Sequence, residues 1–100
     1  MPFYTFIMDY KGGTYISQVN ASSVKTACKK WAENLRVSEI DGFGIKSKEI
    51  LIDEIKADEP VSIKETSNVW CISPWIYGNF ALINIVQTQS INNANPKSEI

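Results

Sequence analysis

The chain has 100 residues, of which 44% are hydrophobic and 21% are charged, and its 10 basic and 11 acidic side chains leave a net charge of -1. This length supports a single soluble domain whose one core needs no metal or disulfide framework. The near-neutral balance argues against a general nucleic-acid-binding protein, which normally carries a basic excess. The chain contains no histidine, so it lacks the commonest general base and the commonest metal ligand.

The N-terminal residues predict a β-hairpin. Residues Phe3–Tyr10 are rich in aromatic and β-branched side chains, which favour a strand. The two glycines of Lys11–Gly13 accept the positive φ angles of a tight hairpin turn, and Thr14–Val19 forms the returning strand.

The strongest periodic pattern of the chain follows this hairpin. Its apolar residues recur every three or four positions and therefore share one face of a helix. They are Val24, Ala27, Cys28, Trp31, Ala32 and Leu35. A serine before this run is the expected N-cap, so the helix is predicted to run from there to about Leu35.

The second half of the chain predicts a short helix and further strands. Two glycines in Asp41–Gly44 indicate a loop, and a second, shorter helix is expected over Ser47–Ala57, ending before Pro60. Strands are expected over residues 61–64, 68–73 and 80–88, with a turn at Tyr77–Asn79.

These elements predict one α+β domain over residues 1–88 and a disordered polar tail over residues 89–100. The expected architecture is a single-layer antiparallel sheet, in the order ββα-α-βββ, with one long amphipathic helix packed on one face. The first and last strands carry apolar residues on both faces, which is typical of strands covered on both sides. Either the second helix and the loops cover the second face, or another subunit does, so a homodimer is one hypothesis.

Cysteine usage and hydropathy predict a cytoplasmic protein that does not associate with membranes. Cys28 and Cys71 are too few for a disulfide framework, and both are expected in the core. The apolar run Phe3–Met8 has no basic lead-in and ends at Asp9, which fits neither a signal peptide nor an anchor. The later run Phe80–Val86 is far shorter than the about 20 residues of a membrane-spanning helix.

No pattern in the sequence predicts an enzyme, a cofactor or a metal site. Without histidine, neither a Ser-His-Asp nor a Cys-His arrangement can form. The segment Gly42–Ser47 lacks the glycine spacing of a phosphate-binding loop. Glu49 and Asp53 are spaced to share one helical face and to ligate a hard cation, but a solvated helix face is the simpler interpretation.

The charges are distributed unevenly along the chain. Residues 1–36 contain five basic and two acidic residues, whereas residues 37–60 contain seven acidic and three basic residues. Within this acidic block, Glu49, Asp53 and Glu54 predict a docking face for a basic protein partner, with ordinary solubility as the alternative. Nucleic acid is not an expected partner, because the lysines of the first helix have no exposed aromatic residues between them.

Aromatic residues gather around the expected turn after Pro74. Trp70 and Phe80 occupy strand positions and are expected in the core. Trp75 and Tyr77 fall in or beside the turn, where burial is harder, and exposed aromatic residues of this kind are typical binding anchors. Both are therefore candidate protein-binding residues, with packing over the sheet edge as the alternative.

The segment YTFIMDYKGGTYISQVNASSVKTACKKWAENL resembles the start of small bacterial HicB-like antitoxin domains. In that family too, a strand pair with a glycine turn leads into an A-S-S-x-x-x-A helix. The chain lacks the Gly-Cys loop and the DNA-binding tail found in many of these proteins. As a whole it also resembles the small immunity proteins of bacteria, and no family residue is carried over from either resemblance.

The leading hypothesis is a non-catalytic small binding protein, an immunity or antitoxin-like partner that neutralises another protein. Two alternatives remain open. One is a homo-oligomeric structural or regulatory protein, and the other is a small-molecule binder with a pocket near Trp75 and Tyr77.

Overall fold

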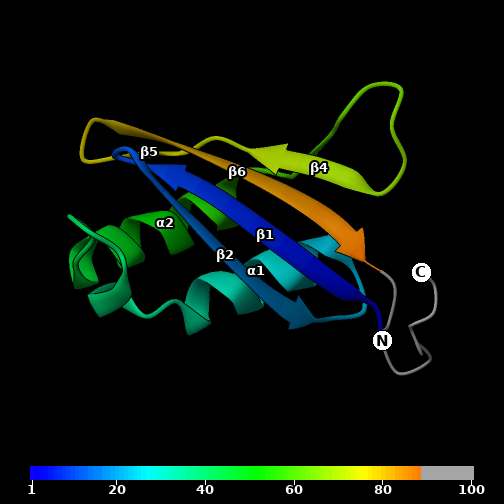
Figure 1. The fold of residues 1–100 in the computed structure, drawn as a ribbon, viewed down its shortest axis with the longest axis horizontal. Coiled ribbons are helices and arrows are strands. Elements are labelled where there is room, and N and C mark those ends of the chain that lie inside the picture. Colours follow the sequence, from blue (N-terminus) through cyan, green and yellow to red (C-terminus); the bar gives the residue numbers. More distant parts are fainter. Residues whose placement is uncertain (89–100) are drawn as a thin grey trace, which may run out of the picture.

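The computed structural model describes residues 1–88 and shows an antiparallel sheet with two α-helices (Figure 1). The elements are β1 (Phe3–Tyr10), β2 (Gly13–Asn20), α1 (Val24–Asn34), a 3-10 helix η1 (Val37–Glu39), α2 (Ile45–Ala57), β3 (Val61–Ser62), β4 (Val69–Ile72), β5 (Trp75–Ile76) and β6 (Asn79–Thr88). The strands are ordered β2-β1-β6-β4-β3, and β5 pairs with β6. The expected α+β class with an antiparallel sheet is confirmed, and the tail expected over residues 89–100 lies outside the described residues.

The first hairpin forms as the sequence predicts. Strands β1 and β2 pair from Phe3 opposite Asn20 to Tyr10 opposite Gly13 without interruption. The turn consists of Lys11 and Gly12, whose φ angles of 49° and 82° are both positive, as a type I′ turn requires. This turn matches the right-handed twist of the two strands and so fixes their register.

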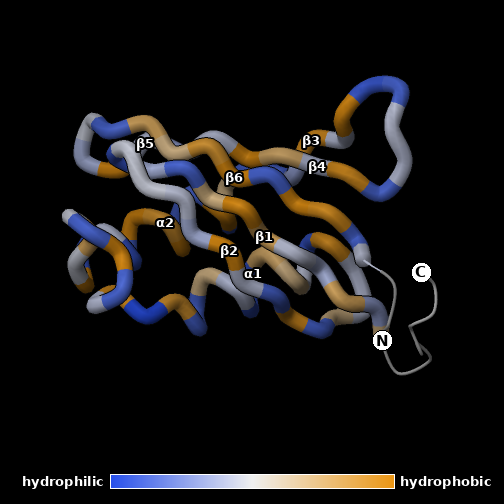
Figure 2. The backbone as a smooth tube through the Cα atoms, viewed as in Figure 1, coloured by the Kyte–Doolittle hydropathy of each residue, from blue (hydrophilic) through white to orange (hydrophobic). Residues whose placement is uncertain are grey.

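The side chains of the central strands alternate between a buried and a less buried face. In β1, Tyr4, Phe6, Met8 and Tyr10 are buried, while the residues between them are half-buried or exposed. Both helices pack on this buried face (Figure 1) and contribute to the same hydrophobic core. Figure 2 shows hydrophobic residues along β1 and β6 and hydrophilic residues in the loop between β3 and β4. Because α2 packs on the same face as α1, it does not cover the other face of the sheet.

The expectation of one long helix and a second, shorter helix is wrong. Helix α1 has 11 residues and α2 has 13, so there is no single long helix. Helix α2 begins at Ile45, earlier than expected, and its first turn is closed by a hydrogen bond from the Gly44 backbone N–H to the Ser47 hydroxyl (3.3 Å). This contact satisfies one of the backbone groups that helix ends leave unpaired.

Strands β4 and β5 are two parts of one hairpin arm. Ile72 lies opposite Ile83 and Trp75 lies opposite Phe80, so both strands keep one register against β6. Pro74 lies between them and interrupts the ladder, because proline has no N–H to donate. The sheet therefore has one more strand than the sequence predicts.

Trp31 is the centre of the contact between α1 and the sheet. Its ring stacks on Phe6 with a centroid distance of 4.7 Å and an interplanar angle of 6°. Its indole Nε1 donates a hydrogen bond to Ser17 Oγ at 3.0 Å, and only 2% of the residue is exposed. The predicted apolar face of this helix is confirmed, since Ala27, Cys28 and Ala32 are buried beside Trp31.

The connection between the helices also fills the core. Ile40 and Phe43 are both 5% exposed, and the Phe43 ring meets Tyr10 edge-on at 5.5 Å. The Tyr15 hydroxyl accepts a hydrogen bond from the Asp41 backbone N–H (3.2 Å), which ties this connection to β2.

Replacing Trp31 by alanine is expected to lower the free energy of unfolding by about 3–5 kcal/mol, because it removes a buried aromatic ring and leaves a cavity. Trp31→Phe retains an aromatic ring and loses the Ser17 hydrogen bond, so it should cost only about 1–2 kcal/mol. Urea titration followed by far-UV circular dichroism measures both values. A loss below about 1 kcal/mol for Trp31→Ala would contradict the central role of this contact.

Candidate functional site

Three large aromatic side chains are exposed on the hairpin formed by β5 and β6. Trp75 and Tyr77 are each 61% exposed, and Phe80 is 48% exposed. The Trp75 and Phe80 rings contact edge-on at 5.5 Å across the strand pair. We call these three residues the aromatic cluster. The exposure of Trp75 and Tyr77 agrees with the sequence analysis, whereas the expectation that Phe80 is buried is wrong.

The turn that carries Tyr77 has an unusual residue for its conformation. Tyr77 and Gly78 have φ angles of 52° and 75°, and Ile76 pairs with Asn79 on either side of them. Such a type I′ turn favours Asn-Gly, because left-handed backbone conformations are uncommon for a bulky side chain. The identity of this residue is therefore not explained by the stability of the turn.

The aromatic cluster lies at one end of the uncovered sheet face. The strand register shows which residues share this face. Ile7 is paired with Ile16 and with Asn84, and Asn84 is paired with Cys71, so these side chains all lie on the same side of the sheet. Its apolar members outside the aromatic cluster are Phe3, Ile7, Ile16, Val61, Val69, Cys71, Leu82 and Val86. We call this surface the open sheet face.

The acidic residues predicted as a docking face do not form one cluster. Glu49 and Asp53 are exposed on the side of α2 opposite Leu51, which is fully buried, so they face away from the sheet. Glu54 is half-buried and lines a cavity on another side of the same helix. Trp75 lies on the open sheet face, so the structure separates the predicted acidic residues from the predicted aromatic ones.

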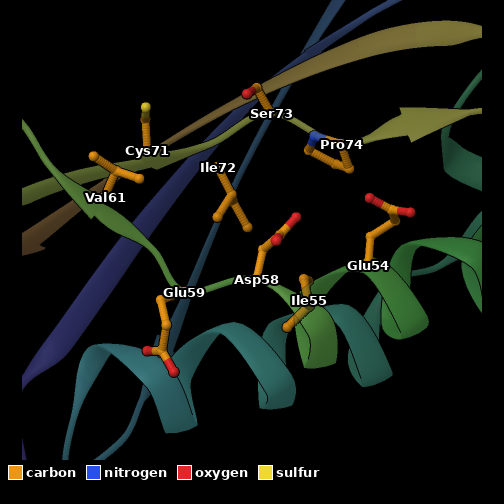
Figure 3. Close-up of a pocket in the computed structure, with 9 residues that line it drawn as sticks. All are labelled: Glu54, Ile55, Asp58, Glu59, Val61, Cys71, Ile72, Ser73 and Pro74. Atoms are coloured by element: carbon orange, nitrogen blue, oxygen red, sulfur yellow. The ribbon is translucent and has the colours of Figure 1, made fainter.

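That cavity is about 190 Å³ in volume and lies between the end of α2 and the segment from β4 to β5 (Figure 3). Figure 3 shows the carboxylates of Glu54 and Asp58 directed into the space between these elements and Glu59 directed toward α1. Within residues 1–88, no group of three or more histidine, cysteine, aspartate or glutamate residues is arranged to hold a metal ion. Neither Trp75 nor Tyr77 lines this cavity.

Ion pairs link the basic and the acidic parts of the sequence, and one of them joins residues far apart in the chain. Lys25 Nζ of α1 lies 2.8 Å from Glu59 Oε2, and both side chains are largely exposed. Helices α1 and α2 pack against each other, so the two segments of opposite charge are neighbours in space. The charge separation along the sequence is therefore partly neutralised in the fold.

The two cysteines differ in their surroundings. Cys28 is 1% exposed in the core, and burial raises the pKa of its thiol to about 12. Cys71 is half-buried on the open sheet face, so the expectation that both thiols lie in the core holds only for Cys28. Neither thiol forms a disulfide within the described residues.

Comparison with protein-family models, with curated proteins and with solved structures finds no match to this chain. Among residues 1–88, neither helix has the length and apolar character needed to cross a membrane.

Replacing Tyr77 by asparagine is expected to raise the free energy of unfolding by about 0.5–1 kcal/mol, because asparagine adopts the left-handed turn conformation more readily than tyrosine. Thermal and urea unfolding measure the change. Tyr77→Phe keeps an aromatic ring in the same left-handed backbone conformation, so its free energy of unfolding should stay close to that of the wild type. A less stable Tyr77→Asn variant would show that the tyrosine contributes to the fold.

In the native protein at pH 8, a thiol reagent is expected to modify Cys71 and to leave Cys28 unmodified. The raised pKa keeps the Cys28 thiol protonated at this pH, and its burial excludes the reagent. In denaturant both thiols should react, and Cys71→Ser should remove the reaction seen under native conditions. Rapid native labelling of Cys28, located by peptide mass spectrometry, would contradict this assignment.

Proposed function

We propose that this protein is a non-catalytic binding domain that recognises another protein through the aromatic cluster, in the manner of an immunity or antitoxin-like protein. The observation that carries the proposal is the exposure of Trp75, Tyr77 and Phe80 together on one hairpin. Tryptophan and tyrosine dominate the energetics of protein interfaces, because they bury a large area with few rotatable bonds. Contiguous exposed apolar groups of this kind mark interaction sites.

The hairpin presents these side chains on a defined backbone. The type I′ turn and the single register of β4 and β5 against β6 fix the directions of the three aromatic side chains. A preorganised surface loses less conformational entropy on binding than a flexible loop.

The composition of the aromatic cluster indicates the chemistry of the partner. Apolar side chains of the partner would contact both the aromatic cluster and the adjoining open sheet face. Basic side chains, arginine above all, bind the faces of tryptophan and tyrosine by cation–π contacts. We therefore propose a partner that presents apolar and basic groups together. We place this interaction in the cytoplasm, where the free thiols of Cys28 and Cys71 stay reduced.

The proposal is tested by comparing variants of the two candidate surfaces. Immobilised wild-type protein, Trp75→Ala, Tyr77→Asn and the doubly reversed Glu49→Lys/Asp53→Lys are incubated with extract of the native cells, and bound proteins are quantified by mass spectrometry. A protein captured by the wild type should be reduced roughly tenfold or more by either aromatic substitution, since interface aromatic residues contribute about 2 kcal/mol or more. The charge-reversed variant should retain it.

Tyr77→Asn separates binding from folding in this experiment. If it is more stable than the wild type and still loses the captured protein, the loss cannot arise from unfolding. Retention by both aromatic variants and loss by the charge-reversed variant would overturn the proposal and favour the acidic side of α2.

A further inference from the structure

The two edges of the sheet differ in a way that bears on association. Strand β3, at one edge, has only two residues and directly follows Pro60. Strand β2, at the other edge, has eight residues in uninterrupted register with β1. Natural proteins protect edge strands by shortness, proline, bulges or charged side chains, because unpaired backbone groups pair with other chains. Strand β3 has such protection, whereas β2 contains no proline, bulge or charged residue.

The turn geometry shows which backbone groups of β2 face outward. Tyr10 and Gly13 flank a two-residue turn, so they are a hydrogen-bonded pair, and every second residue after Gly13 also bonds to β1. The N–H and C=O groups of Thr14, Ile16 and Gln18 therefore point away from β1. At the far end, the Asn20 carbonyl accepts a hydrogen bond from Lys30 Nζ (2.8 Å), which bounds this free segment.

We propose that β2 pairs with β2 of a second copy of this chain, antiparallel and about a two-fold axis, to form one continuous sheet across a homodimer. A two-fold axis brings the same segment of both strands together, so any charge at its centre would face its own copy. The absence of charge in β2 is what such self-pairing requires. Ile16 is 65% exposed at the middle of this edge, and the pairing would place a side chain of the second copy beside it on the open sheet face.

A groove beside β2 provides room for the incoming strand. It has a volume of about 500 Å³ and is lined by residues 14–19 and by the segment from the end of α1 to Ile40, including Trp31 and Leu35. Side chains of an added strand alternate between the open sheet face and this helical side. Arg36 and Glu39 line this groove and form an ion pair, with 3.4 Å between Arg36 Nη1 and Glu39 Oε2. Because their charges are paired with each other, the groove does not favour an incoming strand of either charge.

The unequal edges also determine the size of the assembly. A sheet with two long free edges would add copies at both ends and grow, whereas here the two-residue edge strand β3 blocks growth. Pairing through β2 alone therefore closes at two copies. This inference does not depend on the proposed function, because β1 separates β2 from the β5–β6 hairpin that carries the aromatic cluster, and the dimer would carry two such clusters.

Light scattering and sedimentation of the purified full chain at micromolar concentrations test the dimer. The wild type should sediment with about twice the 11.3 kDa mass of one chain. Ile16→Lys should raise the dissociation constant by roughly tenfold or more, because it places like charges near the two-fold axis. The matched control is Ser62→Lys on the β3 edge, which should leave the dimer intact.

Hydrogen exchange at each amide identifies the interface independently of any variant. In the concentrated wild type, the amides of Thr14, Ile16 and Gln18 should exchange slowly, and dilution should speed them while Tyr15 and Ser17 stay protected. Circular dichroism and urea unfolding confirm that Ile16→Lys is folded. A monomer at all micromolar concentrations overturns the inference. So does a dimer whose concentration-dependent protection lies outside β2, or one that Ile16→Lys leaves unchanged.

Discussion

Strand β1 can bury only every second side chain against the helices, and the surfaces of the protein follow from this constraint. Tyr4, Phe6, Met8 and Tyr10 are in the core, each with no more than 4% exposure. Burial of such side chains stabilises the fold by about 1.5–3 kcal/mol each, so this face determines where α1 and α2 pack. The neighbouring strands inherit the same alternation through their register with β1. One face of the sheet is thereby covered by the helices, and the other is left open.

Local periodicity allowed the first hairpin and the apolar face of α1 to be predicted. The stripe through Trp31 repeats over three turns, so burial of that side was the only arrangement consistent with it. Strand β5 could not be predicted, because two residues carry no period and their conformation depends on pairing with β6. In β6 both faces are apolar, so the pattern could not show that Ala81, Ile83 and Ile85 point inward and Phe80 outward.

The exposure of Trp75 and Tyr77 could be predicted from sequence, because a turn rarely buries a large ring, whereas that of Phe80 could not. Two physical reasons explain why the acidic residues do not form the single surface that the sequence predicts. Neighbouring residues on a helix point about 100° apart, so Asp53 and Glu54 face different surroundings despite their adjacency. Sums of charge along the sequence also ignore contacts such as Lys25 with Glu59, which are separated by 34 positions. Exposed ion pairs stabilise a fold by at most about 1 kcal/mol, so this contact mainly reduces the electrostatic field around α2.

The placement of β1 beside β6 has a consequence for how the chain folds. The two central strands are the first and the last of the described elements, and Phe3 lies opposite Thr88. The hairpin and both helices are therefore synthesised before the strand that completes the sheet exists. Until Thr88 has left the ribosome, β1 has β2 as its only neighbouring strand, and the side of the core that β6 completes stays open. Contacts this distant along a chain slow folding, because a long loop must close before any of them forms. The apolar surface of the nascent chain is thus most exposed to aggregation in the interval just before β6 arrives.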